Sequence, residues 1–136
     1  MMFLLDTNIF AALSQRKPHR GVERAFKKHA GELVTASLVV HEMCFGIERL
    51  PHSRRRTELE RFMKEVVAGV RVLPYGERAA RWHALERARL TAAGRPPPFL
   101  DGQIAAISAI HDATVVSGNA AHFEPFEGLR VENWLA

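Results

Sequence analysis

Three carboxylates, those of Asp6, Glu42 and Asp101, stand in the sequence where a solvated surface charge is not expected. Asp6 closes an apolar run, Glu42 interrupts the apolar stretch 38–45, and Asp101 directly precedes an apolar helix. Carboxylates held against apolar surroundings are costly unless they share a partner. Because clusters of oxygen ligands suit hard divalent cations, the pattern predicts a site for Mg²⁺, with Mn²⁺ as an alternative.

Each acid also has a structural explanation when it is taken singly. Aspartate is a favoured helix N-cap, which would account for Asp6 or for Asp101. An edge position open to water, or an ion pair with an arginine, would account for Glu42. The three acids together favour the metal site over these separate explanations.

Metal-bound carboxylates of this kind indicate hydrolysis of a phosphodiester. A metal-activated water can attack phosphorus, and the ion stabilises charge on the phosphoryl and leaving oxygens. Thr7 and Asn119 offer neutral polar groups that would position water or phosphate, with local turn and cap hydrogen bonds as the alternative.

Length and composition indicate one domain over residues 1–136, with an apolar fraction of 47% that is sufficient for a core. No apolar run reaches membrane-spanning length, and no secretory signal is recognised, so we expect a cytoplasmic protein. The single cysteine, Cys44, excludes an internal disulfide and is expected to be a small buried apolar residue. The net charge of +4 favours an anionic partner, although only modestly.

Apolar runs and their periodicity predict strands that alternate with helices. This alternation implies parallel pairing through right-handed crossovers, so the predicted fold class is α/β, a three-layer α/β/α sandwich with a mainly parallel sheet of about five strands. Ser37 is the expected N-cap of the helix after the second strand. The predicted strands cover 2–5, 32–35, 70–73, 114–117 and 129–132, and the predicted helices cover 7–15, a short segment around 22–26, 37–50, 53–69, 77–93 and 101–111.

The topology brings the candidate residues to one edge of this sheet. Ligands of such sheets bind beyond the carboxyl ends of the strands. Asp6 ends the first strand, Glu42 lies on the helix after the second, Asn119 follows the fourth, and Asp101 starts the helix that leads to the fourth. We therefore expect these residues to converge.

Four ordered segments resemble the PIN-domain nucleases, and more closely the VapC-type toxins of toxin–antitoxin pairs. Asp6-Thr7-Asn8 after an apolar strand is similar to the opening of that family. The resemblance spans essentially the whole chain in the right order. Its later blocks are Thr35–Ile47 with Glu42, Phe99–Ala106 with Asp101, and Val115–Asn119 followed by His122-Phe123.

The resemblance implies a PIN-like fold and a magnesium- or manganese-dependent endoribonuclease, the toxin of a type II toxin–antitoxin pair. It also implies a homodimer and a cognate antitoxin protein. Asp6, Glu42 and Asp101 would hold the metal, and Asn119 would complete the catalytic set. Many members carry a fourth acid where this chain has Asn119, so we expect at least one metal ion and a second that is not tightly bound.

The basic run over residues 54–56 adds a candidate contact to the RNA substrate. Arg54 and Arg55 would bind RNA phosphates or an acidic antitoxin segment. Alternatively, they are solvent-exposed residues at the start of a helix. The helical stripe that contains Leu59, Phe62 and Met63 is expected to be core, with part of it available as a groove for an antitoxin helix.

Two other classes of function remain as alternatives. A PIN-like module that binds RNA or protein without cutting is suggested by the missing fourth acid. A phospho-accepting signalling domain also has a parallel sheet with acids at its strand ends. That class usually has two adjacent acids early in the chain and a late lysine after a strand, and this sequence has neither.

Overall fold

The computed structural model describes residues 1–136, and its centre is a five-stranded sheet in the order β3-β2-β1-β4-β5. All four neighbouring strand pairs are parallel, so the predicted α/β class and five-stranded sheet are confirmed. The strands are β1 (Phe3–Leu5), β2 (Leu33–Ala36), β3 (Arg71–Leu73), β4 (Thr114–Val116) and β5 (Arg130–Glu132).

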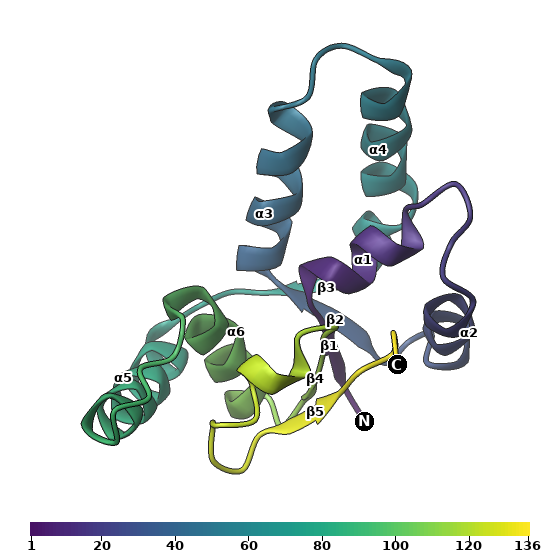
Figure 1. The fold of residues 1–136 in the computed structure, drawn as a ribbon. Coiled ribbons are helices and arrows are strands. Elements are labelled where there is room, and N and C mark those ends of the chain that lie inside the picture. Colours follow the sequence, from purple (N-terminus) through teal and green to yellow (C-terminus); the bar gives the residue numbers. More distant parts are fainter.

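Helices cover both faces of this sheet (Figure 1). The chain moves outward from β1 to β3 and then returns past β1 to β4, so right-handed crossovers place the last two helices on the opposite face from the first four. Figure 1 shows α3 and α4 as an antiparallel pair that projects from the sheet. The helices are α1 (Thr7–Leu13), α2 (Arg20–Lys28), α3 (Ser37–Glu48), α4 (Arg54–Glu65), α5 (Glu77–Ala92) and α6 (Phe99–Ile110), with short 3₁₀ turns η1 (Val67–Gly69) and η2 (Ala120–His122).

Burial of the strands follows their place in the sheet. Every residue of β1 and β4 is buried, as expected for central parallel strands that are covered on both faces. The edge strands are more open: β3 exposes Arg71 and Val72, and β5 exposes Arg130 and Glu132. Charged residues on edge strands discourage pairing with other chains, which keeps the sheet at five strands.

Three local predictions are wrong. The N-cap of α3 is Ala36, and Ser37 is already helical. α6 begins at Phe99 rather than Asp101, because Pro98 ends the proline run in an N-cap conformation and permits a helical turn directly after it. Cys44 is exposed: the later turns of α3 project beyond the sheet (Figure 1), and the residues of these turns that line the groove with α1 and α4 are Met43, Gly46 and Ile47. No helix is both long and apolar enough to cross a membrane.

Candidate functional site

Asp6 lies at the carboxyl end of β1 with only 8% of its surface exposed. One carboxylate oxygen accepts the backbone N–H of Thr7 at 2.8 Å and so caps α1. The other oxygen accepts the hydroxyl of Ser117 at 2.8 Å. A donor from the next residue and a donor from a segment 111 positions away therefore fix the orientation of this carboxylate, and its capping role is compatible with a role in the site.

The loop after β4 is tied to the first turn of α1 through Ser117 and Asn8. The Ser117 hydroxyl oxygen accepts the backbone N–H of Asn119 at 3.0 Å and the side-chain amide of Asn8 at 3.3 Å. The carbonyl oxygen of the Asn8 side chain accepts the backbone N–H of Gly118 at 2.8 Å. Sequence reasoning gave Ser117 and Asn8 no role, although both lie within the segments that carry the family resemblance.

Asp101 is the third residue of α6 and keeps 18% of its side-chain surface exposed. Burial raises the pKa of its carboxyl, and the negative charge of Asp6 raises it further. His122 opposes this shift, because its Nδ1 lies 3.1 Å from a carboxylate oxygen of Asp101. Asp6 and Asp101, which are 95 positions apart in the sequence, are therefore electrostatic neighbours.

His122 is a site residue that sequence reasoning missed. The sequence places it at the end of an element, and the structure confirms that it ends η2. Only the fold shows that this turn brings its ring onto Asp101. The signal available in the sequence was the His122-Phe123 pair, in which the buried Phe123 anchors the turn and leaves His122 exposed.

The electrostatic coupling around Asp101 predicts opposite effects for two substitutions. Asp6→Asn should lower the pKa of Asp101, because it removes a neighbouring negative charge. His122→Ala should raise this pKa, because it removes a favourable partner. Carbon-13 NMR titration of the Asp101 carboxyl measures both, with the exposed Asp112→Asn as control. An unchanged pKa in Asp6→Asn would show that the two carboxylates are not neighbours.

Glu42, the third predicted acid, does not form a three-ligand cluster with Asp6 and Asp101. It lies on α3 and, with Thr7, lines a groove of about 250 Å³ between α1, α3 and α4. The side chain of Glu42 forms no hydrogen bond or ion pair with another residue, and no three His, Cys, Asp or Glu side chains lie in a metal-binding arrangement. The apolar part of this α1–α3–α4 groove is formed by Phe10, Met43, Ile47, Leu59, Phe62 and Met63.

The other predicted site residues, Asn119, Arg54 and Arg55, form no side-chain hydrogen bond or ion pair with Asp6 or Asp101. Asn119 is exposed, and its backbone N–H, rather than its side chain, joins the loop after β4. Arg54 and Arg55 both form ion pairs with Glu58, at 3.4 and 3.5 Å. Arg55 also donates to the backbone carbonyl of Ser14 at 3.2 Å and reaches the α1–α3–α4 groove. Their positive charge is thus partly balanced within the protein.

The donors present are suitable for a divalent ion. Asp6 and Asp101 are partly desolvated carboxylates whose charges disfavour each other, and a shared cation relieves this repulsion. Magnesium in proteins is often held by one or two carboxylates, with water and substrate phosphates completing its shell. The pair therefore fits such an ion without a third protein ligand in direct contact.

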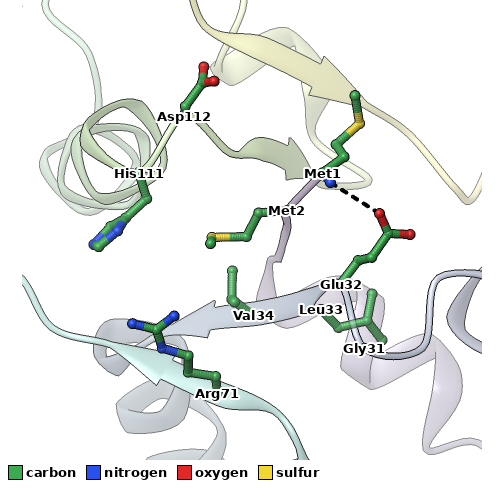
Figure 2. A pocket seen from close by; sticks show the side chains of 9 residues that line it. All are labelled: Met1, Met2, Gly31, Glu32, Leu33, Val34, Arg71, His111 and Asp112. Carbon is green, nitrogen blue, oxygen red and sulfur yellow. Dashed lines mark ion pairs between the residues drawn. The ribbon is translucent and has the colours of Figure 1, made fainter.

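Another pocket, of about 370 Å³, lies at the opposite edge of the sheet. Figure 2 shows residues at the amino-terminal ends of the strands around it, including Arg71 at the start of β3, together with His111, which follows α6. None of the predicted catalytic residues lines this pocket. The carboxylate pair and this pocket are therefore separate features at opposite edges of the sheet.

Comparisons with known proteins agree with the fold and the ordered segments. The PIN domain model matches residues 3–125. The tRNA(fMet)-specific endonuclease VapC of Shigella flexneri is 30% identical over 134 residues, which cover 98% of each chain. The DNA-bound VapBC structure from Salmonella typhimurium contains a chain with a TM-score of 0.86 and 26% identity, covering 98% of each chain. In the FitAcB structure from Neisseria gonorrhoeae, a chain that is 23% identical shares the fold with a TM-score of 0.88, again with 98% of each chain covered. The chain belongs to the PIN-domain family and groups with its VapC members.

Proposed function

We propose that this chain is a divalent-metal-dependent endoribonuclease, and the toxin of a type II toxin–antitoxin pair that acts in the cytoplasm. The observation that carries the proposal is the Asp6–Asp101 pair at the carboxyl edge of the sheet. Its relatives are named as ribonucleases and as a tRNA endonuclease, which supports RNA as the substrate.

In this proposal each residue has a defined part. Asp6 and Asp101 hold a magnesium or manganese ion, which would lower the pKa of a water molecule and stabilise negative charge on the phosphate. The Ser117 hydroxyl orients Asp6 by its hydrogen bond. Glu42 approaches from α3 as the third acid, and Thr7 and Asn119 position water or phosphate at the rim of the site.

Dependence on a divalent ion is the direct test. The purified chain, freed of any partner, should cleave RNA in Mg²⁺ or Mn²⁺, lose cleavage in excess chelator, and regain it when metal is restored. Calorimetry without RNA should show metal binding that weakens strongly in Asp101→Asn. Cleavage that persists in chelator, or that is equal in Asp101→Asn, would instead identify a metal-independent activity or a contaminating nuclease.

The partners in this proposal are an antitoxin and a second copy of the chain. The chains matched in solved structures include members of VapBC complexes, so we place an antitoxin segment in the α1–α3–α4 groove, where apolar side chains lie next to Glu42. Arg54 and Arg55 are the candidate contacts to its acidic residues or to RNA. Co-purification with the product of the adjacent reading frame, and the mass of the isolated chain in solution, test the two partners separately.

The position of Glu42 favours one second candidate, a PIN-like module that binds RNA or protein without cutting. This candidate is favoured because no third acid closes around Asp6 and Asp101. Such a module would bind RNA equally well with and without chelator and would leave the RNA intact. The metal experiment therefore separates the two candidates.

A further inference from the structure

His83 on α5 is a buried ionisable residue that the proposed reaction does not use. It is only 2% exposed, and its Nδ1 lies 3.0 Å from the hydroxyl of Tyr75. Its Nε2 is the one buried side-chain nitrogen or oxygen atom without a hydrogen-bond partner. Buried polar atoms are rarely left unpaired, so the position of this ring edge calls for an explanation.

The unpaired edge of the His83 ring faces the backbone of α6 at Gly102. A Cβ added to Gly102 would overlap Nε2 and would lie 2.7 Å from Cδ2. Glycine is thus required here by close approach. The ring of Phe99, three residues earlier on α6, packs against His83 with a centroid distance of 5.0 Å. The first turn of α6 therefore rests directly on His83.

This turn also carries one member of the carboxylate pair. Gly102 directly follows Asp101, so the distance between α5 and α6 fixes where the Asp101 carboxylate stands relative to Asp6. Sites that bind metal or perform catalysis need positions correct to about 0.5 Å, and a misplacement of about 1 Å can cost roughly a hundredfold in rate. A small change at this contact is expected to be felt at the site.

The charge state of His83 is consistent with a packing role. Burial, together with the positive charge of Arg87, lowers the pKa of its imidazole. A neutral ring can exchange one hydrogen bond with Tyr75 and present its other edge to the helix without placing a charge there.

We propose that Tyr75, His83 and Gly102 form a positioning unit that sets the depth of the first turn of α6 and thereby the separation of Asp101 from Asp6. Tyr75 holds the ring, the ring supports the helix, and the missing side chain of Gly102 permits the contact. In this proposal all three residues act on the site through the position of Asp101. The expected effect of this positioning unit on catalysis rests on the proposed function. Its effect on the position of Asp101 can be tested without RNA.

The test is a double-mutant cycle at the contact. Gly102→Ala should lower kcat by at least about tenfold with little change in KM, and should weaken Mn²⁺ binding to the protein, because the new methyl group pushes α6 away. His83→Ala removes the obstructing ring, so the double variant should recover most of the kcat and of the Mn²⁺ affinity. Gly69→Ala is the matched control, since an added Cβ there has no atom within 4 Å.

If His83→Ala is too unstable to purify, the variant Tyr75→Phe and the amide NMR shift of Asp101 still test the proposal. Tyr75→Phe removes only one hydroxyl and should fold, with a several-fold loss of kcat and of Mn²⁺ affinity. The amide NMR shift of Asp101 should move in Gly102→Ala and return in the double variant, whether or not the protein cuts RNA. If Gly102→Ala and Tyr75→Phe both leave this shift and the Mn²⁺ affinity unchanged, the positioning unit is refuted. If the parent cuts no RNA but the shifts follow the cycle, only the proposed function fails.

Discussion

Asp101→Asn is expected to reduce metal-dependent RNA cleavage by at least about a hundredfold while the fold is retained. Substituting even an outer partner of a metal ligand typically costs 10–100-fold, and Asp101 is proposed as a ligand itself. The substitution preserves size and removes the charge that is coupled to Asp6. It should not destabilise the protein, because it relieves repulsion at a group whose raised pKa shows that its charged form is disfavoured.

Initial rates with saturating magnesium, together with thermal unfolding curves, measure this effect. The control is Asp112→Asn, which changes an exposed aspartate in an ion pair with Arg130 near the opposite end of α6. The control should cut RNA at the parental rate. Parental activity in Asp101→Asn would remove this residue from the metal site, and an unfolded variant would show that the carboxylate is structural.

Phe123→Ala is expected to have the largest effect on stability among residues close to the site. Its side chain is fully buried and anchors the turn that carries His122. Truncating a buried phenylalanine costs about 3–5 kcal/mol, a large share of the roughly 5–15 kcal/mol that stabilises a domain. We expect the midpoint of thermal unfolding to fall by roughly 10 °C or more.

Calorimetric or denaturant unfolding measures this loss, and Phe45→Ala provides the comparison. Phe45 is a phenylalanine of α3 that is 52% exposed, so its truncation removes far less buried surface and should cost under about 1 kcal/mol. Equal losses in the two variants would contradict the assignment of Phe123 as the buried anchor of this loop.

Much of the fold could be predicted because its signals are local. The continuous apolar run at β1 and the strand–helix alternation were sufficient for a parallel α/β sheet. Convergence of Asp6 with Asp101 also followed from topology, since the carboxyl ends of parallel strands share one edge. The start of α6 was misplaced because a proline run forbids a regular helix only up to its last member.

The rest of the site could not be predicted because it depends on which helices and loops pack against one another. The apolar stretch 38–45, which Glu42 interrupts, suggested a buried segment, yet Phe45 within it is half exposed and Glu42 itself lines the α1–α3–α4 groove. Cys44 was expected to be buried for the same reason. Apolar character predicts burial only where another element lies above the helix, and α3 extends beyond the sheet (Figure 1).

The sequence by itself determined the family, the order of the strands and helices along the chain, and the expectation that Asp6 and Asp101 lie near each other, because these depend on residue type, periodicity and strand order. Only the tertiary structure decided that Ser117 holds Asp6, that His122 meets Asp101, and that His83 supports α6 at Gly102. These contacts join residues 19–111 positions apart, and their distances are set by packing between helices and loops, which no local pattern encodes.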